Sequence, residues 1–242
     1  MDAENVLTTT FDTLNINDNL LRGIYSYGFE NPSKIQNEAV PLIIKGSDLI
    51  AQAQSGTGKT GAFLIGTLEK IDTSKKETQI LILAPTHELV HQIYEVASEL
   101  GKYLRLSIME VVGGTSVHEC REGLDKQPHI IIGSPGRVLD MIQKNFLYTN
   151  NIKTLIFDEA DEILSYGFKE TIYNIVKSVP KTCQICLFSA TIPAELLELS
   201  SSFMNNPEKL LVDKEALTLE GITQFHINIR ISDWKYDVLK DL

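Results

Sequence analysis

The sequence contains few cysteines, no long apolar run and an excess of acidic residues. Its 3 cysteines in 242 residues form no disulfide framework and fit a reducing compartment. The apolar runs are too short for a membrane span, so we expect no membrane contact. A formal net charge of −10 argues against a broad basic surface for nucleic acid, because phosphate contacts need Lys or Arg. A short track of backbone amides with a few local cations stays compatible with this charge.

The first residues, MDAENVLTTTFDTLN, contain neither a basic nor an apolar segment, so we expect no signal peptide. We therefore expect a cytoplasmic protein, with the nucleus as the alternative. A hydrophobic content of 43% over 242 residues allows one large domain or two small ones with a proper core.

Two of the cysteines, Cys183 and Cys186, form a CxxC pair, which also occurs in zinc and redox sites. The surrounding TCQICLF has the composition of a buried strand, in which residues three apart point to opposite faces. No second CxxC or CxxH follows in the sequence. We therefore predict two ordinary core cysteines.

Short apolar runs recur along the chain, each followed by a turn signal and a stretch of helical character. Most are rich in Ile, Leu and Val and apolar on both faces, as strands of a covered parallel sheet are. The runs lie at 48–53, 80–85, 107–113, 129–133, 154–160, 184–190 and 209–213. The helix candidates are 58–71, 87–102, 135–144, 161–178 and 193–203. One apolar face of the second helix is marked by Leu89, Ile93, Val96 and Leu100.

This alternation predicts an α/β domain with a mostly parallel central sheet and helices on both faces. In such sheets, ligands bind at the carboxyl ends of the strands. The residues that follow each apolar run are therefore the first candidates for a functional site.

The first run leads into AQSGTGKT, in the order strand, glycine loop and helix that a phosphate-binding loop requires. Its glycines let backbone amides converge on an anion, and the helix that begins there adds its positive dipole end. Lys59 is suited to the β- and γ-phosphates, and the Thr60 hydroxyl to ligation of Mg²⁺. The expected nucleotide loop comprises Ala53, Gln54, Ser55, Gly56, Thr57, Gly58, Lys59 and Thr60. Ala53 stands where the strict pattern has a glycine.

The fifth run leads into DEAD, residues 158–161. A carboxylate at the end of a neighbouring buried strand is the second anchor that a nucleotide-bound Mg²⁺ needs, and we assign Asp158 to it. Glu159 is placed to orient or deprotonate the attacking water. Together with Lys59, these two acids are the predicted catalytic residues. Without the phosphate-binding loop, the acidic stretch would suit a solvated helix start.

AQSGTGKT, DEAD and SAT (189–191) occur in this order, with GFENPSKIQ (28–36) ahead of them. With these motifs, essentially the whole chain resembles the amino-terminal RecA-like domain of a DEAD-box RNA helicase. FDTLNINDNLLRGIYSYGFENPSKIQ and EGITQFHINI are similar to the 4A class of eukaryotic translation initiation factors. The resemblance implies a RecA-like P-loop fold, ATP and Mg²⁺ as cofactors, and ATP-dependent RNA binding and unwinding in translation initiation.

The resemblance also implies an adenine pocket ahead of the phosphate-binding loop. Gln36 hydrogen-bonds the adenine edge, which an amide does through paired contacts. Phe29 stacks on the base, and Phe11 supports the pocket from upstream. Without the family, Phe11 and Phe29 would be core aromatics.

A coupling between nucleotide state and RNA strand separation is implied for the SAT motif. Ser189 and Thr191 carry it through hydroxyl bonds to Asp161.

The implied RNA contacts fall in PTHELV (85–90), GG (113–114) and SPGR (134–137). They are Pro85, Thr86, Gly113, Gly114, Pro135, Gly136 and Arg137. Paired glycines let a phosphate approach backbone amides, and Arg137 supplies a local positive charge. His87 replaces the family arginine, a permanent bidentate cation. Ser134 replaces the family threonine and keeps the hydroxyl.

Residues 87–91 read HELVH, the pattern by which helical zinc proteases hold their metal. Zinc needs a third ligand, and neither Glu95 nor Glu110 follows a known ligand pattern. We interpret HELVH as a coincidence and keep a zinc metalloprotease only as an alternative function. His91 is expected near the apolar face or partly exposed.

We divide the chain into a RecA-like domain at 1–212, a linker at 213–221 and the start of a truncated second RecA-like domain at 222–242. The adenine-recognition segment lies within residues 1–46. The second domain of the family supplies an arginine that completes the ATP site.

The implied partners are RNA, contacted with little sequence preference, a HEAT-repeat scaffold protein of the initiation complex, and the rest of the second RecA-like domain. A single-lobe module that binds RNA or a scaffold without turnover is the alternative.

Overall fold

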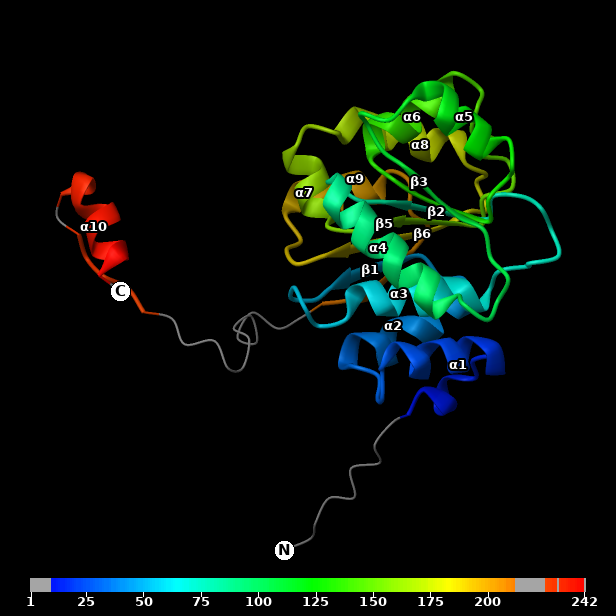
Figure 1. The fold of residues 1–242 in the computed structure, drawn as a ribbon, viewed down its shortest axis with the longest axis horizontal. Coiled ribbons are helices and arrows are strands. Elements are labelled where there is room, and N and C mark those ends of the chain that lie inside the picture. Colours follow the sequence, from blue (N-terminus) through cyan, green and yellow to red (C-terminus); the bar gives the residue numbers. More distant parts are fainter. Residues whose placement is uncertain (1–9, 212–224, 230, 242) are drawn as a thin grey trace, which may run out of the picture. The chain divides into compact units, whose positions relative to one another are not determined.

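The computed structural model describes residues 10–211, 225–229 and 231–241. The chain divides into two compact units, Met1–Val212 and Asp213–Leu242 (Figure 1). The described part of the second unit contains a 3₁₀ helix, η3 (Ser232–Trp234), and α10 (Lys235–Lys240). The predicted linker lies outside the described residues. None of the helices in the described ranges is long and apolar enough to cross a membrane.

A seven-stranded sheet in the order β3-β4-β2-β5-β6-β1-β7 forms the centre of the first unit. All of its strand pairs are parallel. The strands are β1 (Leu49–Gln52), β2 (Ile80–Leu83), β3 (Ile108–Val111), β4 (Ile130–Gly133), β5 (Thr154–Phe157), β6 (Gln184–Ser189) and β7 (Glu208–Leu210). Each predicted apolar run overlaps one of them, because Ile, Val and Leu fit a sheet that is covered on both faces.

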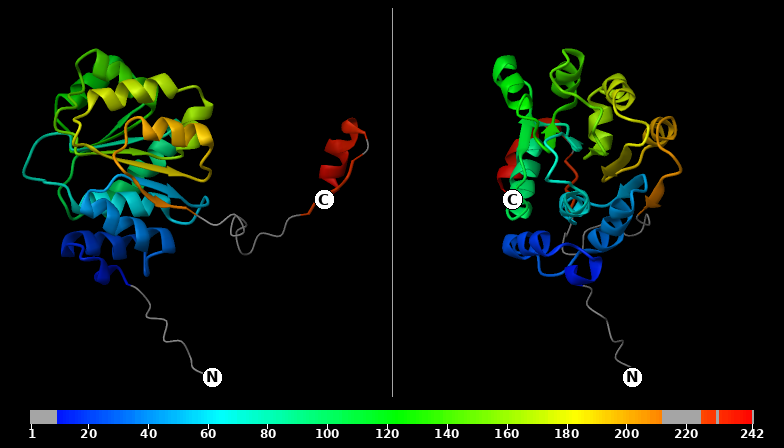
Figure 2. Two further views of the ribbon diagram at one scale, coloured as in Figure 1. Left: turned by 180° about the vertical axis from the view of Figure 1, so that it is seen from behind. Right: turned by 90° about the vertical axis from the view of Figure 1, so that its right-hand side faces the viewer.

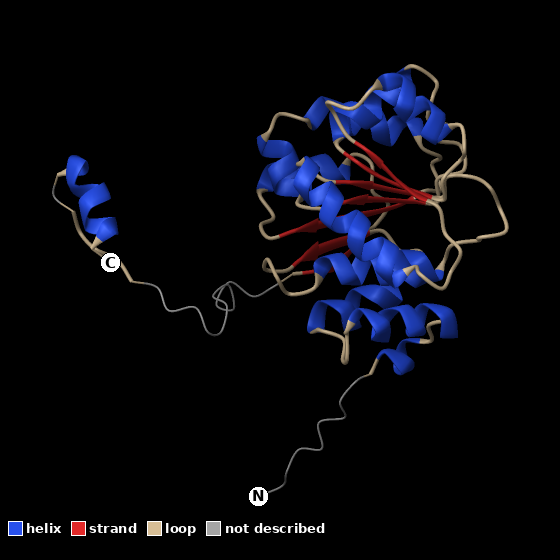
Figure 3. Ribbon diagram, viewed as in Figure 1, coloured by secondary structure: helices blue, strands red, loops and turns tan. Residues whose placement is uncertain are grey.

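Helices lie on both sides of this sheet (Figure 3). One side carries α1 (Asp18–Tyr27), α2 (Lys34–Lys45), α3 (Lys59–Glu69) and α4 (His87–Leu100), preceded by η1 (Phe11–Leu14). The other carries α5 (Val117–Leu124), α6 (Pro135–Gln143), α7 (Ala160–Ser165), α8 (Lys169–Ser178) and α9 (Ala194–Ser201). The two further views in Figure 2 show the same arrangement. The predicted α/β architecture is confirmed.

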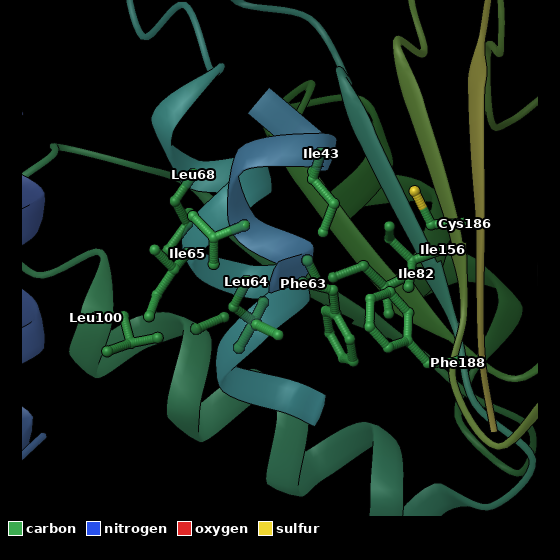
Figure 4. Packing of buried hydrophobic residues seen from close by; sticks show 14 of the residues in the cluster. Ile43, Phe63, Leu64, Ile65, Leu68, Ile82, Leu100, Ile156, Cys186 and Phe188 are labelled. Atoms are coloured by element: carbon green, nitrogen blue, oxygen red, sulfur yellow. The ribbon is translucent and has the colours of Figure 1, made fainter. Parts of the chain in front are cut away.

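Two hydrophobic cores hold the layers together, because successive residues of a strand point to opposite faces. In β2, Ile82 belongs to the core under α1–α4, whereas Leu81 belongs to the core under α5–α9. In the first core, the rings of Phe63 on α3 and Phe188 on β6 lie 5.3 Å apart (Figure 4).

The two cysteines of the CxxC pair follow the same alternation. Cys186 belongs to the first core and Cys183 to the second, as predicted for residues three apart in a strand. Both are buried and free. Burial raises the pKa of Cys183 to about 12, so its thiol stays protonated and acts as an apolar side chain.

Two helix predictions were wrong in detail. Residues 161–178 form two helices, α7 and α8, rather than one, because Gly167 adopts a φ of 81° between them. The buried face of α4 carries Val90 and Ala97 beside Ile93 and Leu100, while Leu89 and Val96 are only partly buried. The helices α1, α2 and α5 were not predicted.

Candidate nucleotide and RNA site

The strand order sorts the predicted site residues into two groups at the carboxyl edge of the sheet. The neighbouring strands β5, β6 and β1 lead into DEAD, SAT and the phosphate-binding loop. The neighbouring strands β3, β4 and β2 lead into GG, SPGR and PTHELV. One half of the edge therefore carries the predicted phosphate, metal and coupling residues, and the other half carries the predicted RNA contacts.

The phosphate-binding loop turns sharply before α3. Gly56 and Gly58 have φ of 80° and 100°, which side-chain-bearing residues rarely adopt. Lys59 then begins α3 and is only 6% exposed. Its Nζ donates to the Ala53 carbonyl at 3.1 Å and lies 3.0 Å from Glu159 Oε1. The loop thus brings a buried ammonium group to the predicted catalytic carboxylate.

Asp158 is buried at the end of β5, where it is 2% exposed. Its Oδ1 accepts a hydrogen bond from the Glu159 backbone N–H at 3.1 Å. Burial, followed by the charge of Glu159, raises the pKa of Asp158 to about 7, against the opposing effect of Lys59. A buried carboxylate with so little compensation suits a divalent cation, which has a strong preference for carboxylate oxygen.

Glu159 itself has a left-handed backbone, with φ 47° and ψ 54°. Such a conformation costs a non-glycine residue on the order of 1–3 kcal/mol and is concentrated at functional sites. Its side chain is 19% exposed, so the carboxylate reaches toward the loop rather than into the core.

Gln36 connects α2 to the phosphate-binding loop. Its Oε1 accepts from the Ser33 backbone N–H at 2.9 Å, and its own N–H donates to Ser33 Oγ at 3.4 Å, which forms a capping box. Its Nε2 donates to the Gly58 carbonyl at 3.3 Å. Each amide atom still has one N–H or lone pair for a ligand. The role of Ser33 was missed, although Ser-x-x-Gln before a helix is a readable capping signal.

The aromatic residues of the predicted base pocket are in contact. The rings of Phe11 and Phe29 stack at 6.2 Å with an interplanar angle of 19°, and Tyr27 meets Phe29 edge-on at 4.9 Å. A Cβ on Gly61 would lie 3.0 Å from Phe29 Cε2 and 2.6 Å from Gln36 Nε2. The structure therefore brings Phe29 and Gln36 together over the first turn of α3.

A set of hydrogen bonds links the DEAD motif to the SAT motif. The Asp161 backbone N–H donates to Ser189 Oγ at 3.4 Å, and the Thr191 backbone N–H donates to Asp161 Oδ2 at 3.2 Å. The Thr191 hydroxyl donates to the same carboxylate oxygen. Burial acts to raise the pKa of Asp161, but the neighbouring Ser189 hydroxyl and the hydrogen bonds that Thr191 donates outweigh it and leave the pKa below its ordinary value. Within residues 10–211, Asp161 Oδ1 is buried without a partner.

On the other half of the edge, the predicted RNA residues also converge. A Cβ on Gly113 would lie 3.4 Å from His87 Nε2, so the His87 ring lies against this glycine. Both terminal nitrogens of Arg137 donate to the Thr115 carbonyl at 3.1 Å, next to Gly114 with φ 79°. Thr115 was not predicted.

Helix starts supply the remaining predicted RNA residues. Pro85 and Thr86 precede α4, and Thr86 Oγ1 caps this helix by accepting from the Leu89 backbone N–H at 3.2 Å. Pro135, Gly136 and Arg137 form the first turn of α6. Two helix amino termini with positive dipole ends therefore meet in this half of the edge.

The second histidine of HELVH binds carboxylates rather than completing a metal site. His91 Nδ1 lies 2.8 Å from Glu110 Oε1, and its Nε2 lies 3.6 Å from Glu95. The hydrogen bond and charge of Glu110 raise the pKa of His91, whose side chain is 60% exposed. In the described ranges, no group of three or more His, Cys, Asp or Glu residues is arranged to hold a metal ion.

Comparison with known proteins gives consistent matches. The profile of the DEAD/DEAH box helicase family matches residues 33–199. The chain is 51% identical over 233 residues to the ATP-dependent RNA helicase eIF4A of Debaryomyces hansenii, which covers 96% of this chain and 59% of that relative. It therefore spans about 59% of the length of this curated relative.

Solved structures give the same result. A DEAD box protein from Methanococcus jannaschii has a TM-score of 0.79 and 34% identity, covering 83% of this chain and 55% of that chain. S. cerevisiae Dbp5 bound to RNA and ADP BeF3 has a TM-score of 0.88 and 31% identity, covering 96% of this chain and 59% of that chain.

Proposed function

The chain belongs to the DEAD/DEAH box helicase family, and from this premise we propose that it is the first RecA-like lobe of an ATP-dependent RNA helicase that acts in translation initiation. The observation that carries this proposal is the ion pair of the buried Lys59 with Glu159, next to the buried Asp158 at the end of β5. Relatives named ATP-dependent RNA helicase eIF4A support the choice of process.

In the proposed reaction, the loop of residues 53–60 binds the phosphates of ATP, and Lys59 leaves Glu159 to contact them. Asp158 and Thr60 would hold Mg²⁺, which neutralises phosphate charge when bound. The freed carboxylate of Glu159 then orients the attacking water and takes its proton. Gln36 and Phe29 select adenine from the other end of the nucleotide.

RNA binds across the other half of the edge through Thr86, Gly113, Gly114 and the first turn of α6. These groups contact the phosphates and sugars of the RNA, so the lobe has little preference for RNA sequence. The hydrogen bonds that join Asp161 to Ser189 and Thr191 lie at the end of β6, within the nucleotide half. We assign to them the coupling between nucleotide state and RNA.

The complete reaction requires a second RecA-like lobe, which contributes a cation to the transition state. A boundary near residue 212, with 213–221 as linker, belongs to this proposal. So do a cytoplasmic location and a HEAT-repeat scaffold protein as partner. A single-lobe binding module without turnover is the second candidate. It is favoured only by the fact that all of the RNA contacts proposed above come from this one lobe.

Base selection tests the proposal directly. Calorimetry on the 242-residue chain should show distinctly tighter binding of Mg-ADP than of Mg-GDP, because Gln36 offers both a donor and an acceptor to adenine N6 and N7. Gln36→Ala should erase the difference, whereas Gln54→Ala should preserve it. Equal affinities of the unmodified chain for the two nucleotides would contradict the assignment.

A further inference from the structure

A cavity lined by described residues lies at the amino edge of the sheet, opposite the proposed active site. It has a volume of about 440 Å³ and opens between α8, the end of α9 and the residues that precede β1 and β6. Both helices are visible in Figure 2. Small-ligand pockets typically measure about 300–1,000 Å³, so this hollow is large enough for a few side chains of a partner.

The floor of the cavity is apolar and fixed. Cys183 and Ile185 of the second core line it, together with the ring of Phe203 at the end of α9. Asp48 holds two walls together, because its carboxylate accepts from the Ile185 backbone N–H at 2.8 Å and from the Asn205 backbone N–H at 2.7 Å. These two hydrogen bonds connect the start of β6 to the segment that follows α9.

The rim of the cavity is positive in an otherwise acidic chain. Lys177 and Lys181 both line it, and neither forms an ion pair within residues 10–211. Lys177 Nζ instead lies 4.2 Å from the centroid of the Tyr173 ring, which is 42% exposed. The one carboxylate in the lining, Asp48, already accepts two backbone hydrogen bonds.

The apolar floor, the exposed aromatic ring and the two ammonium groups without an ion pair together favour one kind of occupant. A side chain such as Phe or Leu would bury against Phe203 and Ile185, and neighbouring Asp or Glu residues would pair with Lys177 and Lys181. A basic segment would meet like charge at the rim, and a purely apolar one would leave both lysines without a partner.

We propose that this cavity is a docking site for a short acidic peptide segment of a partner protein that carries one bulky apolar anchor. The site lies on the opposite edge of the sheet from the nucleotide and RNA residues. Its occupation therefore competes with neither ligand, and it would attach the helicase to a partner while both remain bound.

A display experiment tests the docking site without knowledge of the natural partner. A random 12-residue peptide library is selected on the intact 242-residue chain and counter-selected on the double variant Lys177→Glu/Lys181→Glu. We expect enriched peptides with Asp or Glu flanking a Phe, Leu, Trp or Tyr. Their Kd, measured by fluorescence anisotropy, should rise at least tenfold on the double variant.

Two controls separate docking from general charge and from misfolding. The variant Lys45→Glu/Lys126→Glu changes the same net charge at exposed lysines elsewhere and should bind the selected peptides normally. Ser202→Trp, which fills the cavity without altering charge, should abolish binding. All variants should keep the Mg-ADP affinity of the unmodified chain. Failure of any acidic peptide to enrich, enrichment of neutral or basic peptides, or binding that survives both Ser202→Trp and the charge reversal would overturn the proposal.

Discussion

At the scale of single residues, the chemistry of the lobe is concentrated in a few strained or poorly solvated groups. Asp158 is buried with a raised pKa, Lys59 is buried against Glu159, and Glu159 adopts a left-handed backbone. Each arrangement costs free energy in the absence of ligand, and in the proposed complex phosphate and a cation would offset this cost.

Replacement of Asp158 by Asn should stabilise the ligand-free chain in a pH-dependent way. The folded carboxyl has a pKa of about 7 against an ordinary 3.8, so folding takes up a proton. The stability that this proton provides is complete below pH 3.8 and is lost as the pH rises through 7. At pH 8 without Mg²⁺ and nucleotide, Asp158→Asn should raise the free energy of unfolding by roughly 2–4 kcal/mol.

Urea denaturation at pH 4 and pH 8 measures this effect. The variant should gain stability only at pH 8, while Glu162→Gln, which changes an exposed acid of α7, should gain at neither. An equal gain in stability at both pH values would show that burial does not raise the pKa of the Asp158 carboxyl.

His87 offers the second prediction at this scale. Its ring lies against Gly113 in the RNA half, where an arginine would place a permanent bidentate cation on phosphate. In a protein that carries both lobes, His87→Arg should tighten binding of single-stranded RNA and steepen the salt dependence by about one ion. The matched variant His118→Arg, on the exposed face of α5, should leave both quantities unchanged in filter-binding assays. If His87→Arg behaves like His118→Arg, residue 87 does not touch the RNA backbone.

At the scale of elements, close approaches of backbone decide where the helices lie. Gly23 of α1 packs on the last turn of α4, where an added Cβ would lie 2.0 Å from the Leu100 carbonyl oxygen. This crossing positions α1, whose end leads into Tyr27 and Phe29 of the base pocket.

Gly23→Ala should therefore separate α1 from α4 and destabilise the fold by at least about 2 kcal/mol, because a rigid carbonyl cannot give way. Gly136→Ala is the matched control, since its new Cβ would meet only Phe168 Cε1 at 3.7 Å, an ordinary contact. Thermal unfolding should show a lower Tm for the first variant and an unchanged Tm for the second. An unchanged Tm for Gly23→Ala would mean that α1 can shift without loss.

The sequence predicts elements better than it predicts their junctions. Strands such as 80–85 could be predicted because apolar runs of that length are typical of a covered sheet. Once the strands are known, the functional motifs are expected at their carboxyl ends. The break between α7 and α8 at Gly167 could not be predicted, because the helical pattern of the sequence resumes directly after it. The contact between Arg137 and Thr115 could not be predicted either, since it joins the first turn of α6 to the loop after β3, which the β3–β4 pairing brings together.

At the scale of the whole molecule, the proposed phosphate site is formed by one lobe, residues 10–211 of the described chain. Lys59, Asp158 and Glu159 all come from this lobe, and in the proposed arrangement no cation among its described residues faces the far side of the γ-phosphate. Charges stabilise a transition state weakly in an open, wet cleft.

The 242-residue chain alone should thus bind Mg-nucleotide but hydrolyse ATP at least about 10²-fold more slowly than a protein with both lobes. RNA should not stimulate the single lobe, and phosphate-release assays with and without RNA measure this. Addition of the second lobe should restore stimulated turnover, which Glu159→Gln should abolish while nucleotide binding persists. Brisk RNA-stimulated hydrolysis by residues 1–242 would rule out the two-lobe account.

The strand order also determines when each half of the edge can exist during synthesis. On the RNA half, β2 and β3 each pair with β4, so a nascent chain can assemble that half early. Leu49 of β1 must wait for Cys186 of β6 and Glu208 of β7, which leave the ribosome much later. The strand that carries the phosphate-binding loop therefore has no strand partner until β6 has been made, and until then β1 exposes an unpaired edge.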